Sequence, residues 1–441
     1  MSDISITQLE YSTELIDHYY SLSHLPGFVL LESSDKERGR YDIVTAYPYD
    51  FLKVSRNFLN IKSTFDKLKE KLILQDSFCD LPFQGGAIGY FAYDFAEILA
   101  GIRSKPHPYN DLPIVDINFY DWAIVTDHHL KSVSLVVANR QLDTKFIIDE
   151  IISCWKSCSK SKQNFILQDN FRPIISKSSY QQSFEAIYKD LIAGRAYQVN
   201  YTQPFYAKYN GQPFEIYKRV RKSNPVPYAA FIRGEDGDVL SFSPEKFISM
   251  NSGLVETSPI KGTIKRSSDL HADKKLKSIL LSSSKNQAEN IMIVDLLRND
   301  LGKFAKPGTV KVKSLCEIQS FTEVHHLVSN IEAICPDNFN AVDVLKAAFP
   351  GGSITGAPKL EAMRIISEQE PYARGPYCGS IGYFSAHGRF DSNIAIRTII
   401  AKYDTLYLSA GGGIVIDSNW GDEYSECYIK LAAIIKALEK P

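Results

Sequence analysis

The sequence predicts an α+β fold in which large β-sheets pack against helices. Apolar or alternating runs typical of strands come in blocks, at 123–126, 132–137, 199–208, 228–233, 239–242, 247–250, 255–257, 379–384, 392–402 and 405–409. Helical periodicity stands between these blocks, at 57–74, 183–193, 342–349, 359–367 and 424–439. Helices segregated from the strands in this way favour α+β over a regular βαβ alternation.

Apolar spacing justifies the individual elements. Residues 57–74 repeat apolar side chains such as Phe58, Phe65 and Leu72 opposite a charged face, which predicts an amphipathic helix. A polar turn at 127–129 separates the predicted strands 123–126 and 132–137. The last helix carries one apolar stripe, formed by Tyr424, Cys427, Tyr428, Leu431, Ile434, Ile435 and Leu438.

Length and composition limit the architecture and the partners. A chain of 441 residues predicts two or three domains, and the polar segment 156–179 is the best candidate linker between 1–155 and 180–441. With 50 basic and 51 acidic residues, the charge balance gives no reason to expect nucleic acid or membrane partners. Seven scattered cysteines and no signal-peptide pattern predict a cytoplasmic protein.

Lys261 is the most informative single residue. It lies in Pro259-Ile260-Lys261-Gly262-Thr263, between a proline turn and a glycine, which predicts a lysine held in a loop. Such a lysine is a candidate amine nucleophile when its surroundings lower its pKa. A solvated surface lysine is the alternative, and the five residues alone favour it.

Three glutamates predict a divalent cation site. Glu423 and Glu426 stand three apart at the start of the last helix, so both project from one face. Glu289 is expected to open another helix. Carboxylates that converge on one point suit magnesium, which also keeps waters and takes substrate oxygens. Surface glutamates stabilised by helix dipoles are the alternative.

An ordered series of motifs identifies a family resemblance. The motifs are Ser243-Pro244-Glu245, the Lys261 box, Ala288-Glu289-Asn290, Asp295-Leu296-Leu297-Arg298-Asn299-Asp300, His326-Leu327-Val328-Ser329, the segment 350–359, Tyr377-Cys378-Gly379-Ser380, Ile396-Arg397-Thr398, 411–415 and Glu423-Tyr424-Ser425-Glu426. This series resembles the chorismate-utilising enzymes, the family of anthranilate, isochorismate, salicylate and aminodeoxychorismate synthases. The resemblance is strong over the C-terminal three-fifths and weaker over the first 150 residues.

The resemblance implies a fold and a domain division. It implies the fold of anthranilate synthase component I, with an N-terminal region like that protein's at 1–155, the linker at 156–179, and a chorismate-binding catalytic domain at 180–441.

Two residues indicate which reaction within the family to expect. Lysine at 261 is typical of aminodeoxychorismate synthases, whereas anthranilate synthases typically carry alanine there. Gln198 stands where isochorismate and salicylate synthases place a water-activating lysine, and a glutamine cannot act as a base. The resemblance therefore implies amination of chorismate to 4-amino-4-deoxychorismate, for p-aminobenzoate and folate synthesis.

The source of ammonia is expected to be another chain. No Gly-x-Cys-x-Gly elbow occurs, so a separate glutaminase subunit is predicted, giving a heterodimer. One alternative function is anthranilate synthase component I, which Lys261 disfavours. Another is a non-catalytic tryptophan-sensing scaffold subunit, which would need a decayed metal site.

The resemblance also assigns catalytic roles. Lys261 is expected to add to C2 of chorismate while Glu245, as general acid, helps to expel the C4 hydroxyl; burial beside Phe242 and Phe247 would raise the pKa of Glu245. His326 is expected near the ring, although a satisfied core histidine is an alternative.

Substrate and metal contacts are implied as well. The substrate-binding set is Gln198, Ser353, Tyr377, Arg397 and the Gly413 amide, of which Arg397 offers a planar fork for a carboxylate. The magnesium ligands are Glu289, Glu423 and Glu426. Asn286 departs from the family, which carries Glu or Asp there. An amide can still serve if this position reaches the metal through water, and weaker magnesium binding is the alternative.

A second pocket is predicted in the N-terminal part. Three segments resemble the family's tryptophan site, and their pocket residues are Ser33, Arg38, Gly39, Arg40, Tyr41, Pro227, Tyr228 and Ala229. The alternative is that these residues only form core strands and turns.

Overall fold

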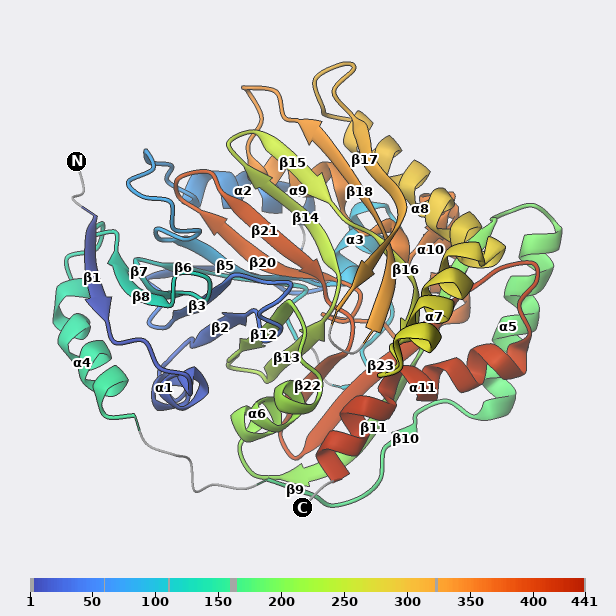
Figure 1. Cartoon of the computed structure of the whole chain (residues 1–441), viewed down its shortest axis with the longest axis horizontal. Coiled ribbons are helices and arrows are strands. Elements are labelled where there is room, and N and C mark those ends of the chain that lie inside the picture. Colours follow the sequence, from blue (N-terminus) through green and yellow to red (C-terminus); the bar gives the residue numbers. More distant parts are fainter. Residues whose placement is uncertain (1–3, 59, 110–111, 159–164, 322–323, 440–441) are drawn as a thin grey trace.

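Two large antiparallel sheets form the body of the protein in the computed structural model (Figure 1). The structure describes residues 4–58, 60–109, 112–158, 165–321 and 324–439. Over these residues, one sheet has 13 strands and the other has 10. Helices cover the outer faces, as an α+β fold requires.

The larger sheet runs in the order β1-β8-β7-β3-β2-β12-β13-β22-β23-β11-β10, and β19 and β9 also pair with β11. Its strands are β1 (Ser5–Leu9), β8 (Ser132–Val137), β7 (Trp122–Asp127), β3 (Tyr41–Thr45), β2 (Val29–Glu32), β12 (Tyr228–Ile232), β13 (Asp238–Ser243), β22 (Thr398–Lys402), β23 (Thr405–Ile414), β11 (Gln198–Asn210), β10 (Arg172–Pro173), β19 (Gly356–Ala357) and β9 (Ile166–Leu167).

The smaller sheet runs in the order β16-β18-β15-β14-β21-β20-β5-β6-β4, and β17 also pairs with β18. Its strands are β16 (Ile260–Lys265), β18 (Val324–Ile334), β15 (Leu254–Thr257), β14 (Lys246–Asn251), β21 (Phe390–Ile394), β20 (Ser380–Ser385), β5 (Gly86–Phe91), β6 (Val115–Tyr120), β4 (Asp50–Val54) and β17 (Lys311–Ser320).

The helices are α1 (Leu15–Leu22), α2 (Thr64–Lys71), α3 (Tyr93–Leu99), α4 (Thr144–Lys156), α5 (Lys177–Ile192), α6 (Pro213–Ser223), α7 (Leu270–Ser282), α8 (Ser284–Gly302), α9 (Ala341–Ala348), α10 (Lys359–Gln369) and α11 (Trp420–Glu439), with short 3₁₀ turns η1 (Ile61–Ser63) and η2 (Gly352–Ile354). Local capping explains several starts: Asp269 accepts from the Ala272 amide at α7, and Ser283 accepts from the Asn286 amide at α8. No described helix is long and apolar enough to cross a membrane.

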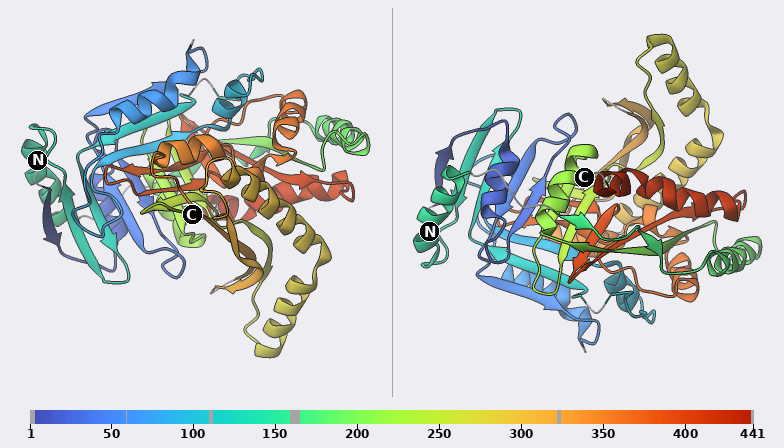
Figure 2. Two further views of the ribbon diagram at one scale, coloured as in Figure 1. Left: turned by 90° about the horizontal axis from the view of Figure 1, so that it is seen from above. Right: turned by 90° about the horizontal axis from the view of Figure 1, so that it is seen from below.

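Helix α7 and the start of α8 project from the body of the protein. Figure 2 shows α7 and the start of α8, in yellow, projecting beyond the body of the protein in both views. The remainder of α8 returns to the body, where Ile293, Val294, Leu297 and Leu301 are buried. The first turns of α8 lie beside β16, at the edge of the smaller sheet.

The segment between the two predicted domains takes part in the sheet. Helix α4 extends to Lys156, Arg172–Pro173 pairs with β11, and α5 begins at Lys177 rather than at 183. Both sheets also combine strands from before and after 156–179. The division at 156–179 therefore stays a prediction about sequence regions, while the sheets are continuous across it.

A buried ion pair ties together the segments that meet at the centre of the molecule. Arg374 donates to both oxygens of Glu370, at 2.9 and 2.7 Å, and also to the carbonyl oxygens of Ile354 and Asn200, at 2.8 and 2.6 Å. Glu370 in turn accepts from the Thr202 amide at 2.8 Å. The two side chains are only 2% and 6% exposed.

Removal of the Arg374 side chain should destabilise the folded protein. We expect Arg374→Met to lower the free energy of unfolding by about 3–5 kcal/mol, because it leaves the Glu370 carboxylate buried without its partner. Urea denaturation measures the change. The control is Arg298→Met, which removes an ion pair with exposed Asp295 and should change the free energy of unfolding by less than about 1 kcal/mol. Equal, small effects of the two substitutions would contradict a structural role for Arg374.

Candidate active site

One cavity of about 600 Å³ brings together most of the predicted site residues. Its walls come from β11 and β23 of the larger sheet, from β16 and β18 of the smaller sheet, and from α8, α11 and η2. The predicted residues that line it are Glu245, Lys261, Glu289, His326, Ser353, Tyr377, Arg397, Gly413, Glu423 and Glu426. Residues that are far apart in the sequence thus meet in one place.

Gln198 is the exception among the predicted substrate contacts. It is buried and does not appear in the cavity wall. A Cβ atom added to Gly413 would lie 2.6 Å from Nε2 of Gln198, so the glutamine lies behind that glycine. Among the described residues its amide has no hydrogen-bond partner. The structure therefore places Gln198 against the backbone of the cavity wall rather than in the cavity.

Lys261 lies in a strand, so the predicted loop is wrong. Strand β16 pairs with β18, and the register shifts between Ile260 and Thr263. Gly262, at φ +82°, supplies the left-handed residue that this bulge requires. Pro259 precedes the strand, where a missing N–H costs no ladder bond. Pairing with β18 thus overrides the local turn signal, and the bulge presents Lys261 to the cavity.

Glu245 has the environment expected of a general acid. It lies between β13 and β14 and is 9% exposed, and Phe242 and Phe247, which precede and follow it in the sequence, are both buried. Burial raises the pKa of Glu245, while the hydroxyl of Ser353, which donates to Oε1 at 2.7 Å, and the charge of Lys261 lower it. The carboxyl is therefore predisposed to hold a proton beside the lysine.

The glycines at 411–413 are part of β23, not of a loop. Gly411 and Gly413 stand opposite Thr202 and Asn200, whose amides donate away from β23, to Glu370 and to the Thr355 carbonyl. In an antiparallel ladder the facing residues then turn their own N–H and C=O groups to the other edge. That edge is the cavity, so the Gly413 amide can donate to a ligand there.

Arg397 interrupts a stretch that was predicted as one strand. Residues 392–402 contain the end of β21 and the whole of β22, and Arg397 between these strands has φ +52°. Its guanidinium makes no ion pair with a described carboxylate; burial, and then the charge of Arg38, lower its pKa. An arginine without an anionic partner at the wall of a cavity is suited to bind a carboxylate from a ligand.

The carboxylates of α11 lie together, but the predicted group of three does not form. A Cβ atom on Gly412 would lie 2.6 Å from Oε2 of Glu423 and 3.4 Å from Oε1 of Glu426. Glu289 lines the same cavity from the second turn of α8 rather than opening that helix. Among the described residues, no three Asp, Glu, His or Cys side chains are grouped closely enough to hold a metal.

The carboxylate oxygens on α11 are nevertheless suitable ligands for a hard cation. Oε2 of Glu423 is buried without a hydrogen-bond partner among the described residues, while Oε1 accepts from Ser418 at 2.7 Å. Burial, and then the charge of Glu426, raise the pKa of Glu423. A buried oxygen without a donor, next to a second carboxylate, is the ligand chemistry that magnesium uses.

Lys430 was missed by sequence analysis. Its Nζ lies 2.5 Å from Oε1 of Glu426 and donates to the Gly411 carbonyl at 2.8 Å, within the cavity. Lys430 is the ion-pair partner of Glu426, and like-charge repulsion opposes the approach of a third carboxylate to the two on α11. The spacing from Glu426 to Lys430 is four residues on one helix, so the pair could have been read from the sequence.

His326 is neutral and held from both sides. Thr263 lies 2.8 Å from Nδ1, and Arg38 lies 3.4 Å from Nε2. Burial first, then the charges of Arg38 and Arg397, lower the pKa of His326 to about 4. The ring can therefore exchange hydrogen bonds in the cavity without carrying a charge.

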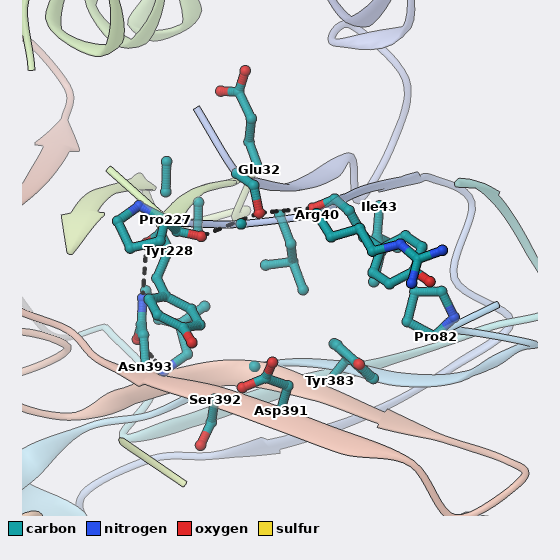
Figure 3. A pocket seen from close by; sticks show the side chains of 18 of the residues that line it. Glu32, Arg40, Ile43, Pro82, Pro227, Tyr228, Tyr383, Asp391, Ser392 and Asn393 are labelled. Atoms are coloured by element: carbon teal, nitrogen blue, oxygen red, sulfur yellow. Dashed lines mark hydrogen bonds between the residues drawn. The ribbon is translucent and has the colours of Figure 1, made fainter. Parts of the chain in front are cut away.

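A second cavity, of about 300 Å³, lies between the two sheets. Figure 3 shows residues of the larger sheet above it and Tyr383 and Asp391 of the smaller sheet below it, with Glu32 pointing away. All the residues of the predicted tryptophan site line it: Ser33, Arg38, Gly39, Arg40, Tyr41, Pro227, Tyr228 and Ala229. Asp391 was not predicted; its Oδ1 is buried without a hydrogen-bond partner among the described residues.

Comparison with known proteins agrees with this arrangement. The model of the chorismate binding enzyme family matches residues 27–436, so the chain belongs to that family. The chain is 40% identical to aminodeoxychorismate synthase component 1 of Salmonella typhimurium, over 99% of this chain and 98% of the relative. It is 39% identical to the protein of the same name from Escherichia coli, over 99% of both chains.

A solved structure confirms the fold. The crystal structure of anthranilate synthase component I from Streptococcus pneumoniae TIGR4 superposes with a TM-score of 0.81 at 30% identity, covering 90% of this chain and 92% of that one. The predicted α+β fold of the anthranilate synthase component I type is therefore confirmed.

The contact between Ser353 and Glu245 gives a testable pKa. We expect Ser353→Ala to raise the pKa of Glu245 further, because the variant loses a donor that stabilises the charged form. A hydrogen bond to a charged group contributes about 1.5–3 kcal/mol, which corresponds to a rise of about one to two pH units. Carbon NMR titration of labelled glutamate carboxyls measures this shift, with Glu245→Gln to assign the signal.

The control for this titration is Ser409→Ala. Ser409 lines the same cavity but is not one of the groups that shift the pKa of Glu245, which are Ser353, Lys261 and Lys430, so that pKa should keep its wild-type value in the variant. An unchanged or lowered pKa in Ser353→Ala would show that the hydroxyl does not stabilise the carboxylate.

Proposed function

We propose that this protein is the chorismate-aminating component of an aminodeoxychorismate synthase, which converts chorismate and ammonia to 4-amino-4-deoxychorismate for p-aminobenzoate and folate synthesis. The observation that carries the proposal is Lys261 beside the buried Glu245 in one cavity. Identity of 39–40% to proteins of that name, over 99% of this chain, supports the proposal. Anthranilate synthase component I is disfavoured, because that reaction does not require a lysine at this position.

The chain's own residues suffice to describe the chemistry. The Lys261 amine forms a bond to C2 of chorismate as the two conjugated ring double bonds shift, and the C4 hydroxyl leaves as water with the proton of Glu245. Ammonia then adds to C4, the two double bonds shift back, and the Lys261 amine leaves C2. The Glu245 carboxylate takes a proton from the new C4 ammonium group, which restores the acid. Arg397 and Tyr377 hold one carboxylate of the substrate, and the Gly413 amide donates to it from the strand edge.

We infer that magnesium is the cofactor. Glu423 and Glu426 on α11, with Glu289 across the cavity on α8, would hold it. When bound, the ion neutralises the second carboxylate of chorismate and draws electron density towards it. Lys430 is the group that balances Glu426 in the structure described here, so metal binding requires Lys430 to release that carboxylate.

Two partners follow from the proposal. A separate glutaminase subunit supplies ammonia, because the sequence contains no Gly-x-Cys-x-Gly elbow, and the two chains act as a heterodimer. The cavity of Figure 3 is suited to L-tryptophan: Asp391 faces the cavity as a partner for an ammonium group, and Tyr41, Tyr228 and Tyr383 supply aromatic walls. No disulfide joins the described cysteines, which fits action in the cytoplasm.

Replacement of Lys261 tests the proposed function directly. Wild-type protein incubated with chorismate, magnesium and ammonium should yield 4-amino-4-deoxychorismate, identified by mass spectrometry. In Lys261→Ala that product should fall to a trace or give way to anthranilate, because the covalent route is lost. The control is Lys285→Ala, which removes a second lysine of the same cavity. Wild-type amination by Lys261→Ala would rule out the assigned role.

Asn286 tests the metal assignment. It lines the cavity from the first turn of α8, close enough to Gly262 that a Cβ there would lie 3.0 Å from its Cγ. Asn286→Asp should tighten magnesium binding by about tenfold to a hundredfold, because it adds a negative charge beside a cation. The measurement is the magnesium concentration that gives half-maximal activity.

Gln287→Glu is the matched control, since it adds the same charge to the next residue of α8 without lining the cavity. A half-saturation point that does not move in Asn286→Asp, or that moves equally in both variants, would show that Asn286 does not face the ion.

A further inference from the structure

A buried lysine, Lys359, binds the segment that leads to Ser353. It is the first residue of α10, and its side chain is only 14% exposed. Its Nζ atom donates to the carbonyl oxygens of Ala348, at 2.9 Å, and Pro350, at 2.7 Å. The same atom pairs with Oδ2 of Asp300 at 2.5 Å. An ammonium group has three N–H donors, so each of them has a partner.

These three bonds join separate parts of the chain. Asp300 belongs to the last turn of α8, Ala348 ends α9, and Pro350 lies in the connection from α9 to η2. Asp300 and Lys359 are the last residues of two of the sequence motifs, 295–300 and 350–359. Because Ser353 follows Pro350 by three residues, the amine of Lys359 holds the start of its segment against α8.

The backbone between Pro350 and Ser353 is closely packed. A Cβ atom on Gly351 would lie 2.4 Å from Cδ1 of Ile394, and one on Gly352 would lie 2.4 Å from Cδ2 of Leu296. Leu296 belongs to α8 and Ile394 ends β21, so the two glycines are enclosed from different elements. A segment packed in this way has no room to adjust by itself, and a shift at Pro350 would move Ser353 as well.

The carbonyl bonds distinguish Lys359 from a lysine that only neutralises a buried acid. Asp300 is 1% exposed and also accepts from Lys303, at 2.8 Å, whose side chain is 50% exposed. Asp300 therefore has two cationic partners. Only Lys359 of these two also donates to Ala348 and Pro350.

We propose that Lys359 is a positioning residue: by holding the carbonyls of Ala348 and Pro350, it directs the hydroxyl of Ser353 to the Glu245 carboxyl. The inference rests on the proposed function only in taking Glu245 as the general acid of the reaction. Lys359 is not one of the described residues that line the active-site cavity, so it acts through Ser353 and not on the substrate.

The consequence for Glu245 is measurable. Burial raises the pKa of Glu245, and the bond from Ser353, at 2.7 Å, is the first of the effects that lower it, ahead of the charge of Lys261. Lys359 is not among the groups that act on this pKa directly. Loss of Lys359 should therefore raise the pKa of Glu245 only as far as it displaces the Ser353 hydroxyl.

Carbon NMR titration of labelled glutamate carboxyls tests the proposal, with Glu245→Gln to assign the signal. In Lys359→Met the pKa of Glu245 should rise by about one to two pH units, as far as in Ser353→Ala, because the charged carboxylate loses its donor. The matched control is Lys303→Met, which removes the other amine on Asp300 and leaves the carbonyl bonds of Lys359 in place. In that variant Glu245 should titrate as in wild type.

The double variant Lys359→Met/Ser353→Ala separates positioning from a general loss of structure. If Lys359 acts through the hydroxyl, the double variant should show the pKa of Ser353→Ala alone, with no further rise. A further rise as large as that in Lys359→Met would overturn the proposal, because the lysine would then act on Glu245 by another route. An unchanged pKa in Lys359→Met, or the same rise in Lys303→Met, would also overturn it.

A second pair of variants keeps the test decisive if Lys359→Met does not fold. Lys359→Met combined with Asp300→Asn removes the buried carboxylate charge together with the amine, so neither charge is left buried alone. Glu245 should show the raised pKa in this combination. It should keep its wild-type pKa in Asp300→Asn, where the amine still holds both carbonyls. A wild-type pKa in the combined variant would overturn the proposal.

These readouts are independent of turnover. If wild-type protein formed no 4-amino-4-deoxychorismate, the proposed function would fail, while the dependence of the Glu245 pKa on Lys359 and Ser353 would still stand. If amination proceeded and the pKa of Glu245 did not respond to Lys359, only the positioning role would fail.

Discussion

The buried pair of Arg374 and Glu370 is the interaction on which the active-site cavity depends. Arg374 binds the carbonyls of Asn200 and Ile354, and Glu370 binds the amide of Thr202. Asn200 and Ile354 line the cavity, and Tyr377 follows Arg374 by three residues. A charged pair sealed from water is held by short hydrogen bonds with defined directions, so it fixes these segments more firmly than apolar contacts would.

The same pair decides what β23 can offer to a ligand. Because Thr202 and Asn200 direct their amides to Glu370 and Thr355, the facing glycines of β23 present their polar backbone to the cavity. The absence of side chains there lets Glu423 and Glu426 approach Gly412 from α11. Strand β23 thus offers its backbone groups to the cavity and leaves room for the carboxylates of α11. Both depend on the hydrogen bonds that β11 makes to Glu370 and Thr355.

The sequence predicted elements and residue identities better than local geometry. Strand 132–137 and the helix that ends the chain were found because their apolar periodicity is local information. Lys261 was predicted in a loop because Pro259 and Gly262 are turn residues, yet pairing with β18 is a long-range contact that no five-residue pattern contains. Likewise, no local sequence pattern predicts the left-handed backbone of Arg397, which divides 392–402 into two strands. Nor does any local pattern predict that Gln198 lies behind Gly413. The order of the motifs predicted that these residues share one site. Which side chains face the cavity depends on long-range strand pairing, which the sequence motifs do not contain.

Charges without partners among the described residues support the proposal of a dianion bound together with a metal. At one wall, Arg397 has no anionic partner in the described part of the chain, and its neighbour Arg38 adds further positive potential. At another, Glu423 has a buried oxygen, next to Glu426, that accepts from no described donor. Each wall alone is destabilised by its own unpaired charge, which is the electrostatic cost of a site prepared for ligands. A substrate with two carboxylates satisfies the first wall directly and the second only through a cation, so binding of chorismate and of magnesium should be mutually dependent: each supplies the countercharge that the other requires.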